Sequence, residues 1–203
     1  NSLTGYSHKE TYNKLLVAPV NLKKGILSRI RREIKVHERD GGGGYIAAKL
    51  NALVDKEIIR ALYRASMAGV KVDLLVRGIC CLRPGLPGVS ENIRVTSLVG
   101  RFLEHSRIHY FRNGGDDEVF LGSADWMPRN LEGRVEVVFP IEGEPHKSAI
   151  RDEILAQQLA DNAHARMLQP DGEYERLRPA DGEAALNSQL EFIATPGSWH
   201  STE

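Results

Sequence analysis

The chain has 203 residues, a length typical of one domain with tails. Its 27 Lys and Arg residues balance 27 Asp and Glu residues, so it is not a globally basic nucleic-acid coat protein. Hydrophobic residues make up 41 % of the sequence, enough for a real core, but no apolar run approaches the ~20 residues needed to span a membrane.

The first half of the chain has the pattern of a parallel β-α-β unit. Residues 22–37 carry apolar side chains at helical spacing, and the run Gly41–Gly44 ends that helix. Residues 45–50 form a short apolar strand, residues 56–67 a second helix, and residues 70–76 a β-branched strand. This order predicts two parallel strands joined by a helical crossover.

The second half continues with further strands and ends in helices. The four strand candidates are 93–98, 107–111, 119–122 and 135–140. Residues 113–115 (Asn-Gly-Gly) indicate a hairpin, 147–165 a helix and 180–193 a short helix. We therefore expect an α/β fold, a mixed β-sheet flanked by helices on both faces. Residues 1–168 would form the domain and residues 169–203 a partly helical C-terminal extension.

One histidine stands in a sequence context suited to phosphoryl transfer. His105 lies two residues before Arg107, and a Gly122-Ser123 turn follows about one hairpin later. An imidazole can attack phosphorus or transfer a proton, while the cation and the Ser123 hydroxyl hold phosphoryl oxygens. The layout resembles one half-site of the phospholipase D-like phosphotransferases, which normally use two such halves. Arg77, at the end of a predicted strand, is expected to converge with His105 on one face.

Arginine is the only strong cation over a long central stretch. Between Arg77 and Arg134 there are eight arginines and no lysine. Arginine makes planar, bidentate contacts with phosphate, whereas lysine is a flexible point charge. We expect about half of these arginines to pair with neighbouring acids and the rest to form a polyanion site.

Several long segments resemble the C-terminal domain of the class-1 polyphosphate kinases. The similarity extends from about Leu3 to about Pro140 and continues weakly through the helix at 147–165. Its most distinctive strings are Ile79–Gly85, Ser90–Val95, Phe102–Tyr110 and Gly122–Leu131.

The resemblance implies reversible transfer of the terminal phosphate of ATP to inorganic polyphosphate, through a phosphohistidine and with Mg²⁺. In that family the last two domains fold as phospholipase D-like halves around one site. His105 matches the second essential histidine, a proton donor or acceptor near the nucleotide phosphates. Arg77 matches an arginine that contacts those phosphates, Arg134 one lining the same site, and Arg107 takes the position of the phospholipase D lysine.

The resemblance also implies that this chain is half of an active site. The histidine taken as the nucleophile belongs to the preceding half, so we expect the isolated chain to be inactive. The partners would be ATP, polyphosphate, the missing N-terminal domains of the same polypeptide and a second subunit, with no nucleic acid. Ligands for Mg²⁺ are expected outside this chain. The two adjacent cysteines favour a reducing, cytoplasmic location, with peripheral membrane association left open.

Two other functions share part of this pattern. A phospholipase D-type phosphodiesterase has the same histidine, cation and Gly-Ser layout, but an Asp at a fixed distance after the cation. Here Asn113 is the sixth residue after Arg107, and the nearby acids are Asp116 and Asp117. A non-catalytic polyanion-binding module is the second alternative.

Three aromatic side chains near the site have open roles. His109 follows His105 by four residues, so on a strand both would lie on one face, where His109 would support the site or pack in the core. Trp126 and Tyr110 are expected in the core rather than against a nucleotide base.

Overall fold

The structure, a computed structural model, describes residues 12–195; the start of the resemblance at Leu3 and the last residues of the extension, 196–203, lie outside this range. The strands are β1 (Leu16–Ala18), β2 (Tyr45–Leu50), β3 (Lys71–Val76), β4 (Ile93–Leu98), β5 (Arg107–Phe111), β6 (Glu118–Gly122), β7 (Glu136–Pro140), β8 (Ala165–Leu168) and β9 (Tyr174–Arg176). The helices are α1 (Leu22–Asp40), α2 (Lys56–Met67), α3 (Glu144–Ser148), α4 (Ala156–Ala160) and α5 (Ser188–Ala194), with the short turns η2 (Asn113–Gly115), η3 (Arg129–Gly133) and η4 (Ala149–Leu155).

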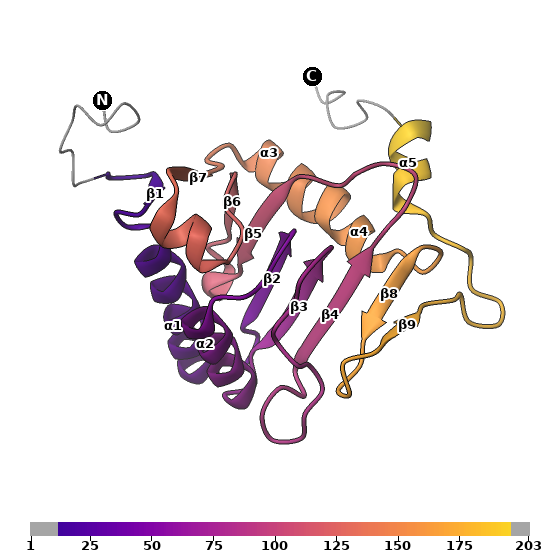
Figure 1. The fold of residues 1–203 in the computed structure, drawn as a ribbon, viewed down its shortest axis with the longest axis horizontal. Coiled ribbons are helices and arrows are strands. Elements are labelled where there is room, and N and C mark those ends of the chain that lie inside the picture. Colours follow the sequence, from indigo (N-terminus) through magenta and orange to yellow (C-terminus); the bar gives the residue numbers. More distant parts are fainter. Residues whose placement is uncertain (1–11, 196–203) are drawn as a thin grey trace.

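Within the described residues the strands form one mixed sheet in the order β1-β7-β6-β5-β2-β3-β4-β8-β9 (Figure 1). Strands β2, β3 and β4 are parallel, and their neighbours on both sides are antiparallel. Helix α2 connects β2 to β3, as the sequence pattern predicts, and begins where the Asp55 carboxylate accepts hydrogen bonds from two backbone N–H groups at 3.0 Å.

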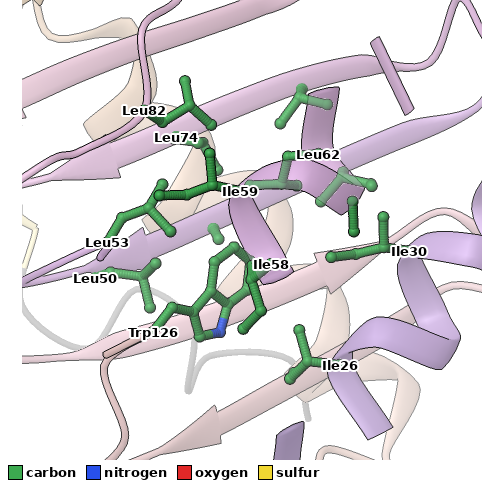
Figure 2. Close-up of a cluster of buried hydrophobic side chains, with 14 of the residues drawn as sticks. Ile26, Ile30, Leu50, Leu53, Ile58, Ile59, Leu62, Leu74, Leu82 and Trp126 are labelled. Carbon is green, nitrogen blue, oxygen red and sulfur yellow. The ribbon is translucent and has the colours of Figure 1, made fainter. Parts of the chain in front are cut away.

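Helices cover both faces of the sheet, which confirms the predicted architecture. Helices α1 and α2 pack on one face, where Ile26, Ile30 and Ile58 belong to the same buried cluster as Trp126 (Figure 2). The helical run from α3 through η4 to α4 packs on the other face through Leu155 and Leu159. Strand β2 serves both cores because its side chains alternate: Ile46, Ala48 and Leu50 face α1 and α2, whereas Ala47 faces α4.

The predicted helix at 147–165 is wrong at both ends. The helical run begins at Glu144 and stops at Ala160, and residues 165–168 form β8 instead. The cause is Asp161, which is fully buried and accepts hydrogen bonds from the N–H groups of residues 163–165 at 2.8 to 3.3 Å. A carboxylate bonded to its own following backbone closes a turn, so the helix cannot continue.

The end of the chain also differs from the sequence prediction. The short helix expected at 180–193 is limited to α5, residues 188–194, because a turn around Gly182 (φ 82°) occupies the first part of that range and the Asn187 side chain caps the helix at Leu190 N. Strands β1, β8 and β9 were not predicted. Since β9 pairs with β8, the sheet continues beyond residue 168, and the proposed division there stays a prediction.

Candidate active site

The residues singled out from the sequence lie at one edge of the sheet, where the arrowheads of β2, β3 and β4 end in Figure 1. Leu50 pairs with Val76 at the ends of β2 and β3. Strand β5 starts at this edge, since Arg107 pairs with Gly122 at the end of β6. Topology therefore brings together Arg77, His105, Arg107, Ser123 and Arg134.

His105 is exposed in the loop between β4 and β5, two residues before the start of β5. The Arg107 guanidinium contacts it twice: Nη1 donates to the His105 carbonyl at 2.7 Å and lies 3.1 Å from ring Nδ1. Because arginine only donates, Nδ1 must accept, and the neutral imidazole then carries its proton on Nε2. The contact with Arg107 therefore favours that tautomer of the neutral ring.

Arg107 is itself held by a buried carboxylate. Its Nε and Nη2 donate to the two Asp125 oxygens at 3.3 and 3.1 Å, a fork geometry that only arginine provides. Asp125 Oδ1 also accepts the N–H groups of Asn51 and Ala52 at 2.7 and 3.3 Å. These contacts orient Arg107 toward His105, and a direct role for Arg107 in phosphate binding stays a prediction.

Ser123 is linked to an acid that the sequence reading missed. Its hydroxyl donates to Glu136, a buried carboxylate at the start of β7 that also accepts from the Asn130 amide at 2.6 Å. The glycine before it is required, since a Cβ on Gly122 would lie 2.5 Å from the Val137 carbonyl oxygen. A signal was present in the sequence: Glu136 is the one charge in an otherwise apolar strand.

Six of the eight arginines between Arg77 and Arg134 have no carboxylate partner within residues 12–195, and two of these six were predicted in the site. Arg77 and Arg134 form no ion pair there, whereas Arg94 binds Asp73 and Arg107 binds Asp125. Nη1 of the half-buried Arg77 is enclosed but has no hydrogen-bond acceptor among the described residues. A buried donor without an acceptor is costly, and an anionic oxygen would satisfy it.

The loop that carries His105 is fixed by a buried ion pair, also missed from the sequence. Lys49 Nζ donates to Glu104 Oε2 at 2.6 Å and to Ser106 Oγ at 2.7 Å. Burial alone would raise the pKa of Glu104, but the hydrogen bonds from Lys49, Gln189 and Gln158 lower it below its usual value. Glu104 is therefore a carboxylate at neutral pH.

The aromatic residues belong to the core. His109 is fully buried and stacks on Trp126 with ring centroids 5.4 Å apart, and neither of its ring nitrogens has a hydrogen-bond partner among the described residues. Burial lowers the pKa of His109 to about 4, so the ring is neutral at physiological pH. Tyr110 is also buried. Of the two roles open for His109, packing is the one the structure shows.

No group of three or more His, Cys, Asp or Glu side chains in the described part of the chain is arranged to hold a metal ion. Mg²⁺ prefers carboxylate and phosphate oxygens, so the residues of this edge do not fit a protein-held Mg²⁺ site. In the same part of the chain, no helix is long and apolar enough to cross a membrane.

The fold is that of the phospholipase D-like proteins. The chain superimposes on a phospholipase D family member, Nuc from Salmonella typhimurium, with a TM-score of 0.56 over 77 % of this chain and 97 % of that one. The two sequences are only 15 % identical, so this likeness concerns the fold alone.

Sequence similarity defines the family. Residues 15–189 match the model of the polyphosphate kinase C-terminal domain 2. The chain is 57 % identical over 194 residues to a polyphosphate kinase of Synechocystis sp. (strain PCC 6803), covering 96 % of this chain and 26 % of that protein. A Pseudomonas aeruginosa polyphosphate kinase is 51 % identical, with coverage of 97 % and 29 %. The chain therefore belongs to the polyphosphate kinase family and corresponds to its C-terminal domain.

A solved structure agrees with this assignment. The crystal structure of polyphosphate kinase from Porphyromonas gingivalis matches with a TM-score of 0.91 at 42 % identity, over 99 % of this chain and 31 % of that chain. The chain thus spans between a quarter and a third of the length of these relatives.

Proposed function

We propose that this chain supplies the C-terminal part of the active site of an ATP:polyphosphate phosphotransferase. The reaction is the reversible transfer of the terminal phosphate of ATP to polyphosphate. The observation that supports it most is the composition of the edge: His105, contacted by Arg107, shares it with Arg77 and Arg134, which lack a carboxylate partner among the described residues.

Arg77 is proposed to bind a phosphate oxygen of the nucleotide. Its enclosed Nη1 lacks an acceptor in the described chain, and a charge-assisted hydrogen bond to phosphate would supply one. Arg134 is exposed ahead of β7 and would contact the same polyanion. The Ser123 hydroxyl is a weaker candidate, since it already donates to Glu136.

His105 is proposed as the proton donor and acceptor, with Nε2 as the working ring nitrogen because Nδ1 contacts Arg107. The nucleophile is a histidine outside this chain. Its nitrogen attacks the terminal phosphorus, forming an N–P bond as the bond to the ADP oxygen breaks, and the protonated His105 ring donates its Nε2 proton to that oxygen. A terminal polyphosphate oxygen then attacks the same phosphorus as the N–P bond breaks, and the neutral His105 ring accepts the proton that this oxygen loses. The reverse sequence regenerates ATP.

The proposed partners follow from the nucleophile lying outside this chain and the proton donor lying within it. ATP or ADP, polyphosphate and the remaining domains of the same polypeptide complete the site. Mg²⁺ is proposed to bind the phosphates and ligands outside this chain, since the described residues offer no metal cluster. We also propose a homo-oligomeric enzyme in the cytoplasm.

The test is mutation within the complete polypeptide. His105→Gln keeps a hydrogen-bonding side chain but cannot transfer a proton, so ATP-dependent polyphosphate synthesis should be abolished. Arg77→Lys should slow synthesis about tenfold or more, because the lysine ammonium cannot make the planar, bidentate hydrogen bonds that a guanidinium makes to phosphate. The matched control is Arg94→Lys, an arginine paired with Asp73, which should retain near-normal activity. Near-normal synthesis by His105→Gln would refute the proposal.

The half-site proposal has its own test. The isolated chain, incubated with labelled ATP, Mg²⁺ and polyphosphate, should show no transfer because the nucleophile is absent. Sustained turnover by the chain alone would show that the nucleophile lies within it.

A further inference from the structure

The loop carrying His105 is not held by burial of its own side chains. Residues 99–106 form neither helix nor strand, and Phe102 and Leu103 leave 49 % and 75 % of their surface exposed. Because this loop buries little apolar surface, other contacts must offset the conformational entropy that is lost when it adopts one conformation. Those contacts come from polar groups far away in the sequence.

The C-terminal helix α5 supplies the main contact, and Figure 1 shows the loop after β4 passing beside it. The amide of the buried Gln189 accepts the Phe102 N–H at 2.9 Å and donates to the Phe102 carbonyl and to Glu104 Oε1, both at 2.9 Å. A Cβ at position 100 would lie 2.4 Å from Gln189 Oε1, so Gly100 permits this approach.

The contacts are distributed along the loop. Gln189 binds the Phe102 backbone and the Glu104 side chain, and Lys49 binds the Glu104 and Ser106 side chains. His105 lies between these held residues; its side chain is exposed, and Arg107 contacts it.

Helix α5 is in turn anchored to the rigid part of the fold. The Ser188 N–H and hydroxyl donate to Asp161 Oδ2 at 2.8 and 2.9 Å, and Asp161 also closes the turn after α4. Leu190 and Ile193 of the same helix are about half exposed, so the helix is not attached through an apolar face. Its buried groups are the ones that reach Asp161 and the loop.

We propose that α5 is a positioning element of the active site, in which Gln189, with Glu104 and Lys49, sets the place of His105. This inference rests on the proposed function of His105. It assigns a role to the C-terminal extension: Ser188 and Gln189 hold the loop that carries the proton donor and so determine where that donor lies.

The experiment compares Gln189→Leu with Leu190→Ala, a change on the exposed side of the same helix, in the complete polypeptide. Hydrogen exchange of residues 99–106, and tryptic cleavage after the exposed Arg101, report whether the loop is held. Gln189→Leu should raise both about tenfold, as expected for losing buried hydrogen bonds, whereas Leu190→Ala should match the parent.

Steady-state kinetics test the positioning role. Gln189→Leu should lower kcat about tenfold and leave KM for ATP within twofold, because the phosphate-binding arginines are unchanged. Gln189→Glu, which places a second carboxylate against Glu104, should be at least as impaired. Adding Glu104→Gln to Gln189→Glu removes that repulsion and should recover part of the lost kcat, an effect that general loss of folding would not give.

The outcomes separate the two proposals. Unchanged exchange at 99–106 in Gln189→Leu would overturn the holding role of α5, and faster exchange with parental kcat would overturn the positioning role. A parent protein without ATP–polyphosphate transfer would instead refute the proposed function, while the exchange result would still show whether α5 holds the loop.

Discussion

Two buried ion pairs flank the proposed site, and they are built in different ways. Arg107 and Asp125 lie 18 residues apart, on the start of β5 and just after the paired strand β6. Lys49 and Glu104 lie 55 residues apart, and the Glu104 carboxylate also accepts from α4 and α5. The first pair orients the histidine ring, whereas the second holds the loop on which that histidine stands.

The comparison shows that orientation and placement depend on different parts of the chain. The Arg107–Asp125 pair lies within one hairpin and its following turn, and its one distant contact is with the backbone just after β2. In the second pair, Glu104 binds Lys49 of β2, Gln158 of α4 and Gln189 of α5, so three separate elements have to come together around it. The predictions below test this separation, from the largest expected effect to the smallest.

Removing Asp125 should have the largest effect. Asp125→Ala leaves Arg107 without its buried counter-ion and two backbone N–H groups without an acceptor, which should cost roughly 3–5 kcal/mol in the free energy of unfolding. Denaturant unfolding of the chain measures it. Asp116→Ala, an exposed acid in the adjacent hairpin, is the control and should change stability by less than about 0.5 kcal/mol. Equal losses of stability in the two variants would show that the contacts of Asp125 do not stabilise the fold.

Removing Lys49 should have a somewhat smaller effect. Lys49→Met leaves the partly solvated Glu104 without its cation, with an expected loss of about 3 kcal/mol. Adding Glu104→Gln should restore part of that loss, since the uncompensated charge is gone. If the double variant is no more stable than Lys49→Met, the pair is not the source of the effect.

His109 should contribute a pH dependence that neither ion pair gives. Its pKa falls to about 4 on folding, against about 6.5 in the unfolded chain, so the unfolded state binds the proton first as the pH drops. The free energy of unfolding should therefore decrease by roughly 2–3 kcal/mol between pH 7 and pH 4.5 through this residue alone.

His109→Phe keeps the ring stack on Trp126 and removes the titration. Urea unfolding of both proteins at the two pH values isolates the histidine, because the carboxylates are common to both. The variant should lose less stability on acidification than the parent. Parallel pH profiles would mean that His109 is solvated in the folded protein.

Much of the fold could be predicted because its signals are local. Alternating apolar residues defined the strands from β2 to β7, and helical spacing defined α1 and α2. The elements that were predicted wrongly or not at all have two causes. Asp161 ends the α4 helix with a single side chain, which no periodicity shows, and the edge strands β8 and β9 are short and partly polar.

The site likewise contains residues that could be predicted from the sequence and residues that could not. His105, Arg107 and the Gly122-Ser123 turn lie in recognisable strings, and the structure brings them to one edge. The partners that hold them were missed, because Glu136, Lys49 and Gln189 become neighbours of these segments only through the sheet order and the return of the chain at its end. Phosphate binding by the predicted residues stays a prediction.

The contact between Phe102 and Gln189 also sets an order of events during synthesis. These residues are 87 positions apart, and a ribosome adding about 5–20 residues per second needs roughly 4 to 17 s to pass from one to the other. During that interval β5, which carries His109, can already pair with β2, but the loop before β5 has no contact with Gln189. A nascent chain that stalls before Gln189 therefore lacks the hydrogen bonds from Gln189 to the Phe102 backbone, and residues 99–106 can take up their final conformation only after α5 has been made.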